Sequence, residues 1–443
     1  MDGWQILLTI LVVGLVALGL MLLISPKFTL RLPFAVLLSI LYRKQVVGLE
    51  NIPKDQGCVV VSNHVSWIDG VLLLWMLPRN IRFVVDGGNF TKPMLKALAN
   101  QFGTILMAPN PKSIGRALKE GREGVKNGDL IGIFPEGTLT RTGQLQTFKP
   151  GYQKMLKGTD GCILPIYTEG MWGSIFSHSG GKLFFKWPNK FRRRLTLHIG
   201  KPLAPETPLA HVRSSVLALG AAATIHNRQE FPILAKRIIR VWRKRWKSLQ
   251  AADSLGQQAS GRSMLVRVFA LRRVLRREVF AKDEQFVGVL LPPSVGGVAV
   301  NVALAMDRRV AANLNYTVSS DVVNHCIKDV GVKHVLSTEK FISKTGLEVD
   351  AEMVMLDTLR DKVTVVDKTI AFIQAYLIPA ALLDLLLGLN KIKADDLLTV
   401  IFTSGSTGMP KGVLLSNANI SHNVDAIERA VRLNNKDTVL GIL

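Results

Sequence analysis

Cysteine is scarce in this chain of 443 residues, which contains only Cys58, Cys162 and Cys326. The three are far apart, odd in number and in no Cys-x-x-Cys pair. This pattern argues against a disulfide framework and against a structural zinc site, and it favours a reducing compartment.

Acidic residues are few relative to basic ones. The chain has 33 Asp and Glu against 56 Lys and Arg, a formal net charge of +23. Such an excess predicts a polyanionic partner, either nucleic acid or an anionic lipid surface.

Charge is absent from the 19 residues Ile6–Ile24. A helix of that length spans about 28 Å, enough to cross a bilayer core. Basic residues flank it only on the C-terminal side (Lys27, Arg31, Arg43 and Lys44), so we expect one anchor in the inner (cytoplasmic) membrane with the rest of the chain in the cytoplasm. The alternative is a buried core helix. Given a membrane anchor, we expect the anionic partner to be lipid and expect no nucleic acid partner.

The rest of the chain alternates strand-like and helix-like segments, which predicts an α/β fold. We expect a membrane anchor and interfacial helix at 1–44, an α/β domain at 45–215, a basic helical linker at 216–284 and a second, partial α/β domain at 285–443. Two basic stretches, 231–247 and 262–280, are either membrane-surface helices or linker helices with a solvated basic face. The apolar stretch 369–389 predicts a buried or interfacial helix rather than a second span.

The segment "SNHVSWIDG" places His64 and Asp69 directly after a predicted strand. A histidine can accept a proton near neutral pH, and a nearby carboxylate can fix its tautomer. The chain has no Gly-x-Ser-x-Gly motif in this region, so the base would activate a hydroxyl of the substrate. The alternative is a structural histidine beside a helix-capping aspartate.

A second strand ends in "FPEGTLTRTG". Its Pro and Gly predict a turn at which Glu136, Gly137 and Thr138 would bind polar parts of an acceptor. Arg141 and Lys149 could hold a phosphate group.

These segments, with "CILPIYTEG", resemble three motifs of the glycerolipid (1-acylglycerol-3-phosphate) acyltransferase family. The resemblance covers about 45–205 and implies acyl transfer from acyl carrier protein or coenzyme A to a lysophospholipid, without a cofactor. His64 would be the general base and Asp69 its orienting partner, both catalytic, with no metal. Glu136, Gly137 and Thr138 would belong to the acceptor site.

Two positions depart from the family pattern. Leu139 and Pro109 stand where many members have arginine. Both changes remove a phosphate-binding cation and speak against a simple lysophosphatidic acid acceptor. The candidates to replace these cations are Arg82, Lys112, Arg116 and Arg141.

The segment "TSGSTGMPKG" follows a predicted strand near the C-terminus. Backbone N–H groups and hydroxyls of such a loop can cradle a polyphosphate. Its spacing is not that of the Walker P-loop. The candidate phosphate-binding residues are Thr403, Ser404, Gly405, Ser406, Thr407, Gly408 and Lys411.

The loop closely resembles that of the adenylate-forming acyl-CoA and acyl-carrier-protein synthetases. This resemblance implies ATP and Mg for that half, and we expect 285–443 to be the N-terminal part of such a domain. The two halves together are similar to bacterial bifunctional enzymes that join a 2-acylglycerophosphoethanolamine acyltransferase to an acyl-[acyl-carrier-protein] synthetase. The competing functions are an ATP-dependent long-chain fatty acid ligase and a non-catalytic membrane scaffold.

Overall fold

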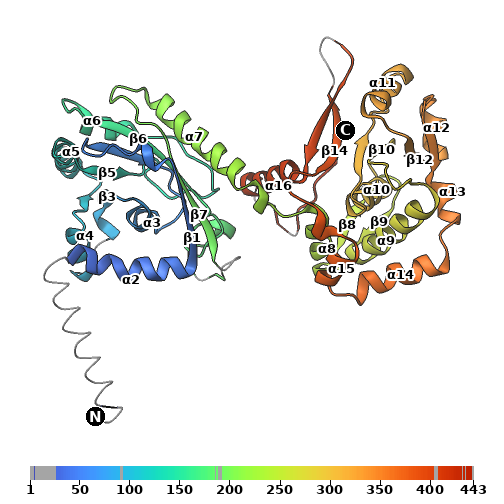
Figure 1. Ribbon diagram of the computed structural model, residues 1–443, viewed down its shortest axis with the longest axis horizontal. Helices are drawn as coiled ribbons and strands as arrows, with labels where there is room; N and C mark the ends of the chain where they lie inside the picture. The colour runs from blue at the N-terminus through green and yellow to red at the C-terminus, as the bar shows by residue number, and fades with distance from the viewer. Residues whose placement is uncertain are drawn as a thin grey trace. The chain divides into compact units, whose positions relative to one another are not determined.

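The computed structural model describes residue 4 and residues 26–89, 93–184, 186–187, 192–403, 408–431, 433–434 and 436–441. It divides into two compact units, residues 1–226 and 227–443 (Figure 1). The predicted span Ile6–Ile24 lies outside the described residues. Among those described, no helix has both the length and the apolar character needed to cross a membrane.

The first unit is built on a seven-stranded sheet in the order β1-β7-β6-β2-β5-β3-β4. The strands are β1 Tyr42–Val47, β2 Cys58–Ser62, β3 Ile81–Asp86, β4 Ile105–Met107, β5 Leu130–Ile133, β6 Cys162–Glu169 and β7 Arg193–Ile199. The helices are α2 Pro26–Leu41, α3 Asp69–Met76, α4 Pro93–Gln101, α5 Pro111–Lys126, α6 Gln153–Leu156 and α7 Leu209–His226. Strands β2 to β6 run parallel to one another, and β7 is antiparallel to β6.

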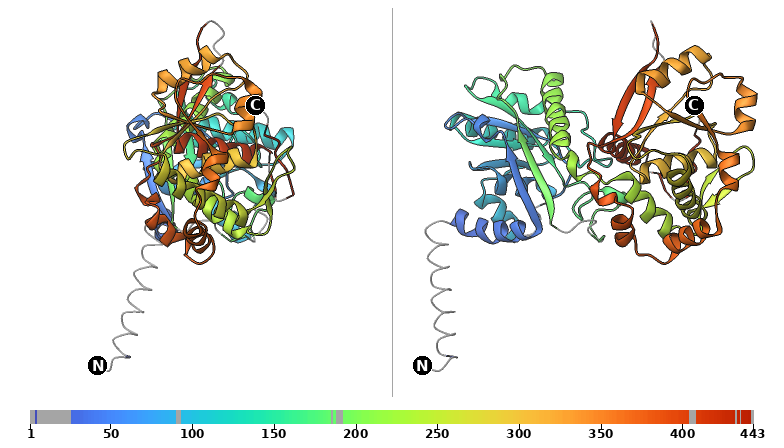
Figure 2. Two further views of the ribbon diagram at one scale, coloured as in Figure 1. Left: turned by 90° about the vertical axis from the view of Figure 1, so that its right-hand side faces the viewer. Right: turned by 45° about the vertical axis from the view of Figure 1, so that its right-hand side comes forward.

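Alternate residues of β2 enter two different hydrophobic cores. Cys58 and Val60 pack with α3 on one face of the sheet, whereas Val59 and Val61 pack with α5, α6 and α7 on the other. Successive side chains of a strand point to opposite faces, so a strand that is apolar throughout must be covered twice. This confirms the predicted α/β fold, with helices on both sides of the sheet (Figure 2).

The second unit contains a six-stranded sheet in the order β13-β12-β10-β11-β14-β15 and a β8–β9 hairpin. The strands are β8 Leu249–Ala252, β9 Gln258–Ser260, β10 Phe286–Val289, β11 Val310–Asn313, β12 His334–Ser337, β13 Glu352–Met355, β14 Leu397–Thr403 and β15 Lys411–Ser416. The helices are α8 Leu234–Lys244, α9 Gly261–Glu278, α10 Val295–Met306, α11 Ser320–Val330, α12 Glu339–Thr345, α13 Leu356–Asp361, α14 Val365–Tyr376, α15 Ala380–Leu386 and α16 Asn417–Val431.

The two basic stretches form α8 and α9, and both helices belong to the second unit. Ile239 and Trp242 of α8 and Phe269 of α9 are buried in one core with α10, α14 and α15. The sequence assigned this region to a linker between domains. The structure differs because each helix has an apolar stripe between its arginines, and that stripe packs on the second unit.

The apolar stretch 369–389 is divided between α14 and α15. The break lies at Pro379, which precedes the first residue of α15. One side of each helix is buried, through Ala371 and Ala375 of α14 and Leu383 of α15. The predicted choice of a buried or interfacial helix over a span agrees with this arrangement.

Candidate active site

His64 lies in the loop that joins β2 to α3, and Asp69 is the first residue of α3. The Nδ1 atom of His64 is 3.1 Å from Oδ2 of Asp69. The Asp69 side chain is 1% exposed and that of His64 is 21% exposed. Because Nδ1 contacts the carboxylate, a neutral His64 that donates from Nδ1 carries its lone pair on Nε2. Such a ring can accept a proton.

Asp69 is held by its own loop. Its Oδ2 accepts the backbone N–H groups of Val65 at 2.7 Å and Ser66 at 2.8 Å, and its Oδ1 accepts the Ser66 hydroxyl. Asp69 is also the first residue of α3, where the helix dipole favours a negative charge. The buried carboxylate therefore has several donors and a fixed orientation toward His64.

Phe134 supports the imidazole from the side. The rings of His64 and Phe134 stack with centroids 4.2 Å apart and an interplanar angle of 12°. Phe83 stacks in turn on Phe134 at 5.8 Å. Phe134 follows β5, the parallel neighbour of β2, so both loops leave the same edge of the sheet. The ring plane of the histidine is thus fixed by packing as well as by Asp69.

Glu136 joins the two loops. Its Oε1 accepts the backbone N–H of His64 at 2.7 Å, and its Oε2 accepts that of Gln146 at 3.0 Å. Glu136 is 5% exposed, and burial raises the pKa of its carboxyl while the two N–H bonds oppose that rise. The sequence assigned Glu136 to acceptor binding. In the structure both oxygens already accept backbone N–H groups, which makes Glu136 a positioning residue.

The next residues of this loop remain accessible. Gly137 and Thr138 are exposed, and Gly137 has a φ of +75°. A Cβ atom at Gly137 would lie 2.8 Å from Nζ of Lys149, so this exposed ammonium stands directly over the glycine. Arg141 is exposed on the same loop. The loop therefore brings together an open backbone turn and cationic side chains.

The predicted phosphate loop is described only at its two ends. Thr403 and Lys411 are cross-strand partners in the β14–β15 hairpin, and the Thr403 hydroxyl donates to the Lys411 carbonyl at 3.4 Å. Lys411 is exposed and pairs with no carboxylate in the part of the chain that the structure describes. Gly408 is also exposed, whereas Ser404, Gly405, Ser406 and Thr407 lie outside the described residues.

Comparison with known families assigns both units. Residues 43–169 match the family model described as Acyltransferase, and residues 240–443 match the model described as AMP-binding enzyme. The chain carries an acyltransferase domain followed by an AMP-binding domain.

Individual relatives match one domain each. A chloroplastic 1-acyl-sn-glycerol-3-phosphate acyltransferase, BAT2, from Brassica napus is 34% identical over 29% of this chain and 38% of its own length. The 1-acyl-sn-glycerol-3-phosphate acyltransferase of Bacillus subtilis is 28% identical over 40% of this chain and 82% of its own. Bacitracin synthase 2 of Bacillus licheniformis is 48% identical over 12% of this chain and 2% of its own. The chain thus spans well under half of the Brassica relative.

Arg82, one of the four candidates to replace the missing cations, is engaged elsewhere. It lies at the start of β3, and its guanidinium bonds Asp129 at 3.1 Å and Glu120 at 2.8 Å. His64 follows the end of β2, which runs parallel to β5 and β3, so Arg82 sits at the opposite edge of the sheet. Lys112 and Arg116 are exposed near the start of α5, which follows β4 at the same edge as His64.

Sequence reasoning missed two supporting residues of the acyltransferase domain. Phe134 had a signal, since it directly precedes the Pro-Glu-Gly turn after a strand. Ser66 had none, because a serine two residues from a histidine is common and its bond to Asp69 depends on the shape of the loop. Neither the described acyltransferase domain nor the described AMP-binding domain contains a group of His, Cys, Asp or Glu side chains that could hold a metal ion.

Proposed function

We propose that the acyltransferase domain transfers a fatty acyl group from an acyl carrier protein or coenzyme A thioester to a hydroxyl of a lysophospholipid. The observation that carries this proposal is the contact of His64 Nδ1 with the buried Asp69 carboxylate, on a ring stacked against Phe134. A histidine oriented in this way acts through Nε2 as a general base.

The reaction follows from that geometry. Nε2 of His64 takes the proton of the acceptor hydroxyl while the hydroxyl oxygen attacks the thioester carbonyl carbon. A C–O bond forms and the C–S bond breaks, and the departing thiolate receives the proton from the imidazolium. Asp69 stabilises the imidazolium between these two steps.

Lys149 supplies a cation for the acceptor. Its ammonium lies over Gly137, in the turn that directly follows Glu136. A phosphate ester bound there would gain a charge-assisted hydrogen bond. Arg141, exposed on the same loop, is a second candidate, and both could serve in place of the arginine that Leu139 replaces.

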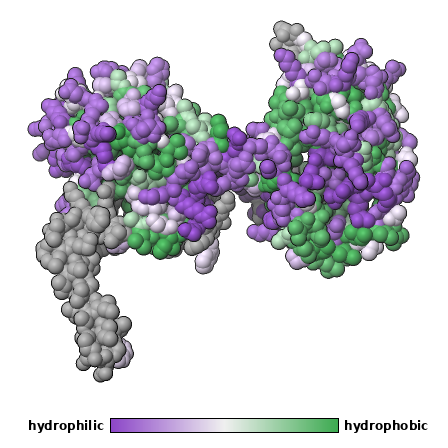
Figure 3. All heavy atoms as spheres, in the orientation of Figure 1, coloured by the Kyte–Doolittle hydropathy of each residue, from purple (hydrophilic) through white to green (hydrophobic). Residues whose placement is uncertain are grey.

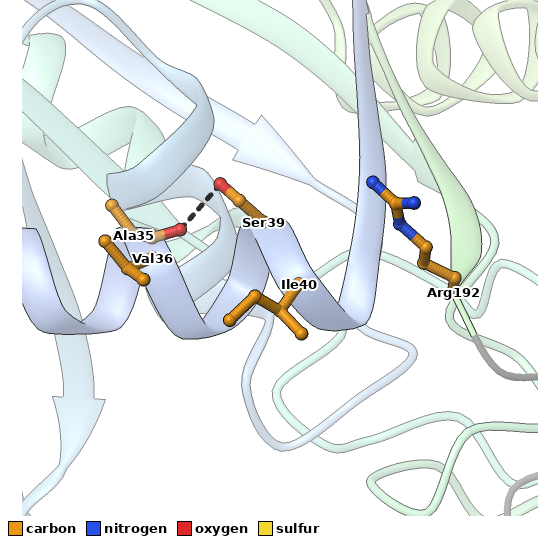
Figure 4. Close-up of a pocket in the computed structure, with 5 residues that line it drawn as sticks. All are labelled: Ala35, Val36, Ser39, Ile40 and Arg192. Carbon is orange, nitrogen blue, oxygen red and sulfur yellow. Dashed lines mark hydrogen bonds between the residues drawn. The ribbon is translucent and has the colours of Figure 1, made fainter.

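We place the acyltransferase domain at a membrane, in line with the apolar sequence 6–24. The outer face of α2 supports this placement, since Phe34, Val36, Leu37 and Ile40 are 44–55% exposed. Val36 and Ile40 border a hollow whose other side is Arg192 (Figure 4). An apolar helix face beside a guanidinium fits the boundary between acyl chains and phosphates.

The AMP-binding domain has its own role in this proposal, which is to make an acyl-adenylate. Bound ATP would supply the adenylyl group, and Thr403, Gly408 and Lys411 would hold its phosphates, usually with Mg. The exposed ammonium of Lys411, which pairs with no carboxylate among the described residues and whose strand partner is Thr403, fits such a ligand. A thioester derived from that product would reach the acyltransferase domain at a high local concentration, because the domains are tethered.

The test is acyl transfer by the full chain in lipid nanodiscs, with lysophosphatidylethanolamine as acceptor and acyl-acyl carrier protein or acyl-CoA as donor. Mass spectrometry of the diacyl product gives the rate. His64→Ala is expected to lower the rate about 10²–10⁴-fold. His211→Ala, on the exposed surface of α7, is the matched control. Product formation that is equal in the two variants, or absent with every lysophospholipid, would exclude the proposed reaction.

A further inference from the structure

The AMP-binding domain has a large apolar surface on α14 and α15. Eight large hydrophobic side chains of these helices and the turn between them are exposed. They are Val365 78%, Val366 61%, Phe372 48%, Ile373 37%, Leu377 70%, Leu382 45%, Leu385 66% and Leu386 58%. Figure 3 shows hydrophobic residues gathered where Figure 1 places these helices. Contiguous apolar patches of this kind mark interaction surfaces.

Helices α14 and α15 expose no carboxylate on this surface. Between residues 365 and 390 the acidic residues are Asp367 and Asp384, which are 0% and 4% exposed. Asp367 bonds Arg273 and Arg277 of α9, and Asp384 bonds Arg240 of α8. Both carboxylates therefore face the interior of the domain and are neutralised there. Lys368 is the only exposed charged residue in this range.

Cations and aromatic rings border the apolar surface. The Arg262 guanidinium lies 4.2 Å above the Tyr376 ring and 5.3 Å from the Trp246 ring. These residues line a hollow with Arg243, whose Nε has no acceptor among the described residues. Lys391 and Lys393, both exposed, follow α15 in the chain.

We infer that α14 and α15 form a second membrane contact, through which the AMP-binding domain itself lies on an anionic bilayer. The apolar side chains enter the boundary between headgroups and acyl chains. Trp246 and Tyr376 lie at the level of the headgroups, as such rings do in membrane proteins. The exposed Arg262 binds a lipid phosphate, and the lysines that follow α15 add attraction to the anionic surface. This contact is independent of acyl transfer.

Charge complementarity favours lipid over a protein partner. Exposed positive charges outnumber negative ones on and next to the patch in the chain: Lys362, Lys368, Lys391, Lys393 and Arg262 stand against Asp361, Asp395 and Asp396, and Asp395 is paired with Arg228. Helices with one apolar face and a basic surround are typical of proteins that lie in the bilayer interface.

The test measures the distance of α14 and α15 from lipid in the full chain. Leu377→Cys and Leu385→Cys are each labelled with a bimane fluorophore, since the native cysteines are buried. Vesicles of phosphatidylglycerol and phosphatidylcholine carry doxyl-labelled lipids as quenchers. Lys328→Cys, exposed on α11 at the other end of the same domain in Figure 1, is the matched control. An anchor elsewhere in the chain would bring all three labels near the vesicle alike.

Quenching is expected to be about twofold stronger at positions 377 and 385 than at position 328. The double variant Lys391→Glu/Lys393→Glu should reduce the signal at position 385 by about half with phosphatidylglycerol. Equal quenching at all three positions would overturn the proposed contact. This is also the result expected if a protein, and not lipid, covers this face. Equal quenching with pure phosphatidylcholine would overturn the role of anionic lipid. The readout needs no turnover, so its failure is distinct from failure of the proposed reaction.

Discussion

Replacing Asp69 with asparagine tests how much the carboxylate contributes to catalysis. Asparagine keeps the shape of the side chain, and its amide oxygen can take the place of Oδ2. The backbone N–H groups of Val65 and Ser66 then keep an acceptor, as does His64 Nδ1. The loop is preserved in this arrangement, and the main loss is the negative charge.

The size of the loss follows from the 3.1 Å distance between His64 Nδ1 and Asp69 Oδ2. Unit charges at that separation interact by about 5 kcal/mol when the effective dielectric constant is about 20. The imidazolium spreads its charge over the ring and the amide dipole restores part of the interaction. We therefore expect kcat to fall about 10³-fold, which corresponds to about 4 kcal/mol. The free energy of unfolding should fall by about 1–3 kcal/mol, because hydrogen bonds to a charged acceptor become neutral ones.

The assay is the initial rate of acyl transfer by the full chain, together with a urea unfolding curve. Ser66→Ala is the control, since it removes the hydroxyl bond to Asp69 Oδ1 and leaves the charge in place. Its rate should stay within about tenfold of the wild type. If Asp69→Asn kept more than about a tenth of the wild-type kcat while folded, the role of Asp69 as the partner of a general base would be refuted.

Three further changes have defined outcomes. Gly137→Ala should raise KM for the lysophospholipid about tenfold and lower the free energy of unfolding by about 1–2 kcal/mol, because the φ of +75° is strained for alanine and the new Cβ meets Lys149. Steady-state kinetics measure the KM and thermal unfolding measures the stability. Unchanged values of both would contradict the turn geometry. Lys149→Ala should raise the same KM about tenfold and leave kcat nearly unchanged. The control Lys154→Ala, at another exposed lysine, should leave both KM and kcat unchanged. Equal KM values in the two variants would show that Lys149 does not belong to the acceptor site. Burial alone would raise the pKa of Asp367, but hydrogen bonds, led by the one from Arg277, hold this pKa below its usual value. The contribution of Asp367 to the free energy of unfolding is therefore complete above the unfolded-state pKa of about 4, and it is lost as the pH falls through the lower pKa of the folded state. Asp367→Asn should therefore cost about 3 kcal/mol at pH 7 and less below about pH 4 in denaturant titrations, and a gap that is constant with pH would contradict this.

The sequence was informative where chemistry depends on residues close together in the chain. His64 and Asp69 are five residues apart, at the loop after β2 and the start of α3, so their contact could be predicted from spacing and from the strand before them. The part played by Glu136 could not be predicted, because it depends on how a distant loop presents the backbone of His64. Phe134 stacks on His64 only because β2 and β5 are neighbours, and strand order is not written in a single sequence.

The basic stretches were harder to interpret for another reason. Seven basic residues within 231–247 are typical of an exposed helix, and they make the apolar stripe of α8 easy to overlook in the sequence. Ile239 and Trp242 are buried, while Arg237 and Arg240 reach acidic side chains of the same unit. The number of charges on a helix therefore does not show whether its other side is buried, and tertiary packing decides the domain to which it belongs.

The hydrogen bonds of Glu136 to the backbone of two loops limit how mutation can change the proposed acceptor site. Glu136 fixes the backbone at His64 and at Gln146, and the Thr140 N–H donates to the His64 carbonyl at 2.9 Å. A mutation that moves any of these three points would move His64, the proposed general base, as well. Within this loop, new head-group preferences can therefore arise most readily between them, at side chains such as Leu139 and Arg141. A library confined to those two positions should yield enzymes with altered acceptors and intact chemistry, whereas random changes across the loop should mostly yield inactive ones.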